Sequence, residues 1–283
     1  MRFLVFFILL CSSSLFALQN NTVIDMTAGY RQDHLDFEYQ AIDLKTGHAE
    51  KGFFKADDLQ IFEIGLKLKY ALERHWYLRG FTDFGWIVDG KSHMRTLYAL
   101  SQPPYSQQDN SGHVMDLGGA LGYAIFAAKK FNFAPVFGWA YQRIKTDLSA
   151  PHRSMQTVRH FKTTWNGPFI GLDLFFQPSV HFVMNGAYAF QVADQRIKMD
   201  VPHAPLLRGH SEWGSLGQLF FLGVWYRCYS GWRFGLEGEY LLDRTFKHPE
   251  MQPTSQEPFY AQAKGGNFHR HAVKGLFSLS YDF

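Results

Sequence analysis

The chain has 283 residues, of which 46% are hydrophobic and 17% aromatic, and 28 Lys or Arg against 25 Asp or Glu leave a formal net charge of +3. So many aromatic residues, with 25 glycines and few signals for helix ends, favour an all-β architecture, and this length requires no second domain. The sequence holds no glycine-rich phosphate loop and no nucleic-acid-binding motif, so nothing in it points to a nucleotide or nucleic-acid partner.

The first 17 residues have the features of a secretory signal peptide. Arg2 supplies the positive start, Phe3 to Leu10 form a short apolar core, and Ser12 to Ala17 provide small residues. This predicts a signal peptide at 1–17 and a mature domain at 18–283. The apolar core has about half of the roughly 20 residues that a spanning helix needs, which disfavours a membrane anchor. After cleavage Cys228 is the only cysteine, so no intrachain disulfide holds the fold.

Segments in which apolar and polar residues alternate recur along the mature chain. Ten such segments are found, at 22–31, 60–72, 76–88, 114–126, 131–144, 164–176, 180–191, 215–227, 232–242 and 273–283. The gaps between them alternate between turns of about three or four residues and loops of about sixteen to thirty. This pattern predicts an antiparallel transmembrane β-barrel of about ten strands with short periplasmic turns and long extracellular loops.

The last strand carries a recognisable ending. Its apolar face holds Val273, Phe277, Leu279, Tyr281 and Phe283, and this Tyr-x-Phe ending resembles the carboxy-terminal signature of bacterial outer-membrane β-barrels. The resemblance implies a place in the bacterial outer membrane, contact with outer-membrane lipid and lipopolysaccharide, and recognition by the barrel assembly machinery through Tyr281 and Phe283. In its general strand pattern the chain also resembles outer-membrane barrels of the Chlamydiales.

The opposite faces of the strands carry charges of both signs. Eight are expected to form a network in the lumen: Glu63, Lys67, Arg79, Asp83, Asp116, Asp173, Arg233 and Glu237. Others share these faces: Asp25, Arg31, Lys69, Arg227, Glu239, Lys274 and Asp282. A barrel of this size has a narrow interior, and unpaired charges there would be costly, so the network is expected to fill it. A narrow water-filled pore is the alternative.

The third long loop is basic. Its candidate binding residues are Lys145, Arg153, Arg159, His160 and Lys162. These residues could bind anionic lipopolysaccharide or a ligand on a host surface, and the alternative is an ordinary solvated surface.

Strand number and chain length also resemble the omptin proteases, whose rim site combines an Asp-x-Asp pair in the second long loop with an Asp-x-His pair in the fourth. Here those loops offer the widely separated Asp89 and Asp109, and Asp200 three residues before His203. We therefore predict no catalytic residues, no cofactor and no metal. The expected function is a non-enzymatic outer-membrane barrel that acts through its surface loops in adhesion, surface binding or envelope structure. A small porin-like channel and an omptin-like rim-site protease are the alternatives.

Overall fold

A computed structural model describes residues 22–43, 49–72, 75–95, 105–108, 110–127, 130–148, 159–200, 207–228, 231–246, 250–253 and 261–283. Ten long strands form the barrel: β1 (Thr22–Asp43), β2 (Ala49–Ala71), β3 (Trp76–Arg95), β5 (Ser111–Tyr123), β7 (Phe131–Leu148), β8 (Arg159–Phe176), β9 (Phe182–Asp200), β10 (Leu207–Arg227), β11 (Trp232–Thr245) and β13 (Ala261–Asp282). Three short strands pair onto it: β4 (Tyr105–Gln108), β6 (Phe126–Ala127) and β12 (Glu250–Pro253). In the described part of the chain, no helix is long and apolar enough to cross a membrane.

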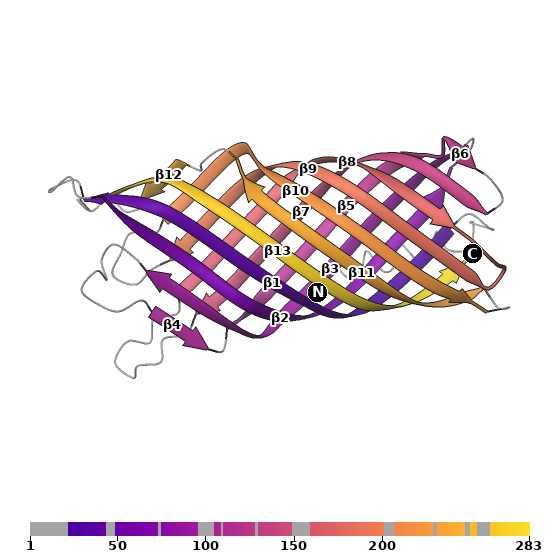
Figure 1. The fold of residues 1–283 in the computed structure, drawn as a ribbon, viewed down its shortest axis with the longest axis horizontal. Helices are drawn as coiled ribbons and strands as arrows, with labels where there is room; N and C mark the ends of the chain where they lie inside the picture. The colour runs from indigo at the N-terminus through magenta and orange to yellow at the C-terminus, as the bar shows by residue number, and fades with distance from the viewer. Residues whose placement is uncertain are drawn as a thin grey trace, which may run out of the picture.

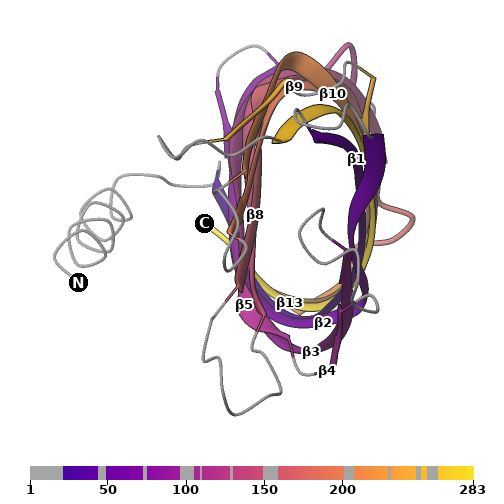
Figure 2. The same cartoon turned by 90° about the vertical axis from the view of Figure 1, so that its left-hand side faces the viewer.

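The barrel is closed by its first and last strands. Each long strand pairs antiparallel with its neighbours in the chain, and β13 pairs with both β11 and β1. The pairing of β1 with β13 begins at Val23 and Asp282, and the amide of Phe283 donates to the carbonyl of Thr22 over 3.0 Å. The predicted fold is therefore confirmed, including the pairing of the final strand with the first. Viewed along its axis, the barrel is a flattened ring (Figure 2).

The strands continue well beyond their predicted ends on the side of the long connections, which we call the loop end (Figure 1). The opposite side, with the short connections, is the turn end. β1 ends at Asp43 instead of Arg31, and β13 begins at Ala261 instead of Val273. Much of the sequence expected as loop is thus strand. The strands were predicted too short because the outward apolar residues end before the backbone pairing between strands does.

In β1 the two faces exchange character at Arg31. Before it, the exposed residues are apolar: Met26, Ala28 and Tyr30. After it, the outward side chains are polar, and beyond the buried Asp33 the inward ones are apolar. The outward residues are Gln32, His34, Asp36 and Glu38, and the buried residues are Leu35, Phe37 and Tyr39. A strand with this pattern has an apolar environment outside its first part and water outside its second.

Strand β10 has aromatic residues on both faces, which left its register open in the sequence. In the half of β10 nearer the turn end, the exposed residues are Phe220, Leu222, Val224 and Tyr226. Trp225 points inward, 3% exposed, and its indole donates to the hydroxyl of Ser278 over 3.0 Å. Two glycines make room for the ring, because a Cβ on Gly223 or Gly235 would lie within 2.3 Å of it. These glycines therefore set the register of β10.

Candidate functional site

A network of buried ion pairs crosses the middle of the lumen. The ammonium of Lys274 on β13 lies 2.8 to 3.3 Å from four carboxylates, those of Glu63, Asp83, Asp116 and Glu239. Arg31 on β1 contacts Asp33 at 2.5 Å and Asp116 at 2.7 Å. Because Asp116 lies on β5, across the ring from β13, these pairs span the lumen. We call this network the ion-pair belt.

The belt includes residues that the sequence analysis did not place inside the barrel. Arg270 contacts Asp33 at 3.2 Å and Asp243 at 3.0 Å, and it donates to Gln142 on the opposite wall over 2.8 Å. Asp33, Asp243 and Arg270 fell beyond the predicted strand ends. The available signal was the alternation itself, because Arg270 lies four residues before Lys274 and so shares its face.

The eight predicted lumen residues all line the interior. Lys67 contacts Glu237 at 2.5 Å and Glu239 at 2.9 Å, which joins it to the belt. Nearer the turn end, Arg79 contacts Asp173 at 2.6 Å, and Arg233 pairs with Asp282. Glu63, Asp83 and Asp116 belong to the belt as described. The structure therefore brings seven of the eight into two clusters of contacts and leaves Arg233 at the rim.

On the loop side of the belt, the lumen is filled by apolar side chains, which we call the apolar plug. Its buried residues are Leu35, Phe37, Tyr39, Phe54, Ala56, Leu59, Ile61, Ile87, Val114, Ile144, Phe161, Trp165, Ala193, Ile197, Met199 and Phe268. Rings from facing walls touch there: Phe54 of β2 stacks on Phe161 of β8 with ring centroids 4.0 Å apart. Trp165 packs against Phe268, with ring centroids 5.2 Å apart, and against the guanidinium of Arg270, 4.9 Å from its ring centroid. The apolar plug therefore contacts the ion-pair belt through Trp165 and Arg270.

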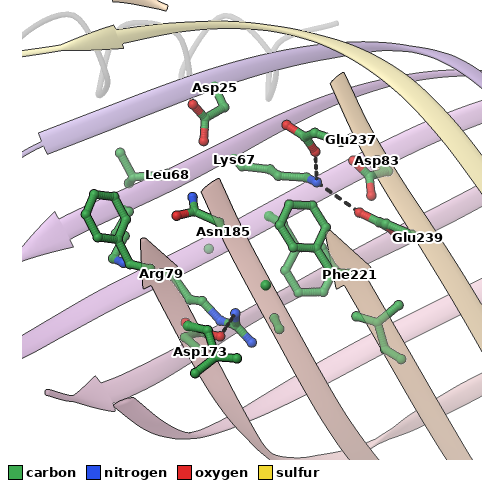
Figure 3. Close-up of a pocket in the computed structure, with 18 of the residues that line it drawn as sticks. Asp25, Lys67, Leu68, Arg79, Asp83, Asp173, Asn185, Phe221, Glu237 and Glu239 are labelled. Carbon is green, nitrogen blue, oxygen red and sulfur yellow. Dashed lines mark hydrogen bonds and ion pairs between the residues drawn. The ribbon is translucent and has the colours of Figure 1, made fainter. Parts of the chain in front are cut away.

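On the turn side of the belt lies a cavity of about 180 Å³ (Figure 3). Phe221 and the Lys67 pairs form part of its lining, and Arg79, Asp173 and Asn185 lie at another side. Tyr77 donates to Asp173 over 2.6 Å. The cavity is polar and apolar in patches, and the belt separates it from the apolar plug.

The predicted basic site is a wall of strands and not a loop. Lys145 lies in β7, and Arg159, His160 and Lys162 lie in β8, while Arg153 falls outside the described residues. Lys198 and Arg196 of β9 and Arg143 of β7 extend the same outward surface, and the sequence analysis missed them. We call Arg143, Lys145, Lys162, Arg196 and Lys198 the basic wall.

Two histidine–carboxylate contacts lie on the outside of the loop end. His160 contacts Asp147 at 2.5 Å, and Lys145 contacts the same carboxylate at 3.0 Å. Partial burial favours a higher pKa for Asp147, but hydrogen bonds from Lys145 and His160 outweigh it and hold the pKa below its usual value. On the far wall, His34 lies 3.2 Å from Asp58 and stacks on His271 with ring centroids 4.3 Å apart. Burial, and then repulsion from His34, lowers the pKa of His271.

The residues compared with the omptin site are only partly placed. Asp89 lies in β3, and Asp200 ends β9, whereas Asp109 and His203 fall outside the described residues. Within the described ranges, no group of three or more His, Cys, Asp or Glu is arranged to hold a metal ion.

A closed antiparallel barrel with an apolar outer band and a charged interior is the architecture of bacterial outer-membrane proteins. A family model described as Protochlamydia outer membrane protein matches residues 25–264. The chain belongs to this family of bacterial outer-membrane proteins. No curated protein matches it.

The chain is similar to several solved structures at low sequence identity. The outer membrane protease OmpT from Escherichia coli superposes with a TM-score of 0.67 at 10% identity, covering 93% of this chain and 97% of that one. A major outer membrane protein from Thermus thermophilus gives a TM-score of 0.39 at 10% identity, with 94% and 100% covered. The Pseudomonas putida toluene transporter TodX gives 0.36 at 10% identity, with 95% and 91% covered. The first likeness shows the fold alone.

Proposed function

We propose that this protein is a closed, non-enzymatic barrel of the bacterial outer membrane that acts through the outer wall of its loop end, in surface binding, adhesion or envelope structure. The observation that carries this proposal is the contact between facing walls inside the apolar plug, where Phe54 stacks on Phe161 at 4.0 Å. A hydrated path would have to separate such rings, at a cost of about 1.5–3 kcal/mol for each large apolar side chain exposed again to water.

The decisive test is conductance. Purified full-length protein is inserted into planar lipid bilayers, with a general-diffusion porin in the same membrane as the positive control. We expect no discrete openings, because the ion-pair belt and the plug lie in series along the lumen. Regular single-channel openings that scale with the amount of folded protein would contradict the proposal and favour the porin-like channel.

The channel remains the second candidate because the cavity on the turn side of the belt is polar on one side. Its charged lining, with Lys67 and Arg79, would suit a small polar solute. If openings are observed, removing two plug rings in the variant Phe54→Ala/Phe161→Ala should increase the current, because both rings occupy the lumen. An unchanged current would place the path elsewhere.

The non-enzymatic part of the proposal has its own assay. Purified protein in lipopolysaccharide-containing micelles is incubated with a dibasic peptide, and cleavage is followed by mass spectrometry. We expect intact peptide. Cleavage that disappears in a His203→Ala variant would identify a rim-site protease instead.

A further inference from the structure

The basic wall places like charges directly opposite one another. Lys162 of β8 pairs in register with Lys145 of β7 on one side and with Lys198 of β9 on the other. One step nearer the turn end, Arg143 and Arg196 flank Thr164 in the same way. Like charges facing across antiparallel strands destabilise a sheet, so this arrangement lowers stability unless an anion is bound.

The described part of the chain supplies little compensation for these charges. Among the side chains that the structure places, which do not include that of Asp200, no carboxylate lies within 4.0 Å of four members of the wall: Arg143, Lys162, Arg196 and Lys198. Lys145 has Asp147 as a partner, but that carboxylate is shared with His160. Burial, followed by repulsion from the neighbouring basic residues, lowers the pKa of Lys162. The wall is therefore a strip of positive charge across three strands.

The height of the strip relative to the membrane is set by the aromatic residues beneath it. On β7 the outward residues run Phe137, Trp139, Tyr141 and then Arg143 and Lys145. Tryptophan and tyrosine occupy the interface between hydrocarbon and headgroups. At about 3.4 Å per residue, Arg143 lies roughly 7 Å beyond Tyr141 along the strand, and strand tilt shortens that height further. Both basic rows thus lie at headgroup level.

A pair of tryptophans supports this placement. Trp213 sits in a bulge of β10 with a positive φ of 50°, and its amide donates to Asp194 over 2.8 Å. This irregular backbone holds the Trp213 ring edge-on to Trp139, with centroids 6.3 Å apart. The surface therefore has an exposed aromatic pair below and cations above, which is the order in which a phosphorylated glycolipid presents its acyl chains and its phosphates.

We infer that the basic wall binds the phosphate groups of lipopolysaccharide, the phosphorylated glycolipid of the outer leaflet, with Trp139 and Trp213 against its acyl–sugar boundary. Strands lie about 4.8 Å apart, so neighbouring lysines can share one phosphate. The depth of the wall favours a membrane lipid over a soluble polyanion, which would reach the outer tips of the barrel more easily. The inference rests on the proposed use of the outer wall and names its partner.

The test compares two variants of equal charge change. The wall variant is Lys145→Thr/Lys162→Thr/Lys198→Thr, since threonine suits a strand. The control is Lys51→Thr/Lys55→Thr/Lys91→Thr on β2 and β3, where the lysines are also exposed but Lys51 and Lys55 have the acidic neighbours Glu38 and Asp57. Full-length protein in neutral detergent is titrated with bisphosphorylated lipid A and, separately, with the dephosphorylated lipid, and bound lipid is counted by native mass spectrometry.

We expect the wall variant to bind the bisphosphorylated lipid on the order of a hundredfold more weakly, at roughly fivefold for each cation removed, and the control to bind it normally. Equal losses in both variants, or equal binding of the dephosphorylated lipid, would overturn the inference. So would full competition by soluble heparin, which would point to a polyanionic glycan. Folding is checked by gel migration with and without boiling, and if the triple variant does not fold, Lys162→Thr alone should show the fivefold loss. The conductance assay tests the closed lumen separately.

Discussion

Replacing Lys274 by methionine removes one cation from the centre of the ion-pair belt while keeping most of the apolar stem of the side chain. Three of its four carboxylate partners keep another cation: Glu63 and Asp116 still contact Arg31, and Glu239 still contacts Lys67. Asp83 does not, because Lys274 is its only cation within 4.0 Å among the described residues. The variant therefore leaves one buried carboxylate without compensation.

The magnitude follows from that count. Breaking a buried pair by removing one partner costs about 3–5 kcal/mol, and a single orphaned carboxylate places Lys274→Met near the lower end, at about 3 kcal/mol. The double variant Lys274→Met/Asp83→Asn removes the orphan and should recover most of this loss. Lys69→Met is the matched control, because among described residues the ammonium of Lys69 has no ion pair and lies over the ring of Tyr77, at 4.3 Å. It should cost about 1 kcal/mol or less.

The free energy of unfolding is measured by urea titration of protein folded in lipid vesicles, with tryptophan fluorescence as the signal and linear extrapolation to water. If Lys274→Met is as stable as Lys69→Met, the belt does not hold the lumen together as described. If Asp83→Asn fails to restore stability in the double variant, the orphaned carboxylate is not the cause of the loss.

Three further predictions concern the barrel seam and its surface. Gly29→Ala should lower the unfolding free energy by about 1–3 kcal/mol, because its Cβ would lie 2.1 Å from a carbonyl oxygen of β13. Gly275→Ala should be neutral, because a Cβ there has open space. Equal effects of the two variants would refute the steric explanation. Burial and repulsion from His34 lower the pKa of His271, so protonation of His271 as the pH falls below about 6.5 opposes folding. The variant His34→Gln should raise the pKa of His271 in an NMR titration. An unchanged pKa would contradict the repulsion. Phe283→Ser should reduce the heat-modifiable protein in outer-membrane fractions; wild-type amounts would exclude recognition through this residue.

The parts of the fold that could be predicted from sequence are those where one face of a strand meets lipid. There the outward stripe is continuously apolar, as at Tyr30, and the inward residues can be assigned by alternation. Arg270 and Asp33 continue this alternation, but they were not assigned to strands because the outward residues beside them, such as His269 and His271, are polar, so the segment resembles a loop. Backbone pairing with a neighbouring strand, which extends these strands, depends on residues distant in sequence.

The basic wall, too, could be predicted only in part from the sequence. The sequence identified Lys145 and Lys162 by their concentration in one stretch, but it assigned them to a loop, where their spacing would carry no meaning. The strand register places Lys198 of β9 beside Lys162, although Lys198 lies beyond the predicted end of its strand and far from Lys162 in sequence. Charge content can be read locally, whereas the alignment of charges into a row is set by pairing between strands.

The exchange of faces along β1 connects the closed lumen to the outer surface. In the part of the barrel that faces lipid, the polar side chains point into the lumen. Charged side chains there need partners of opposite sign, and they find them in the ion-pair belt. Once the outer face reaches water, the polar residues can lie outside, and the interior is free to pack Phe37 and its neighbours into the plug. Under the proposed function, side chains of the barrel's own strands close the lumen. Because sealing and surface contacts use opposite faces of the same strands, the outward residues of the loop end can change without opening the lumen, which is the property that a surface-binding barrel requires.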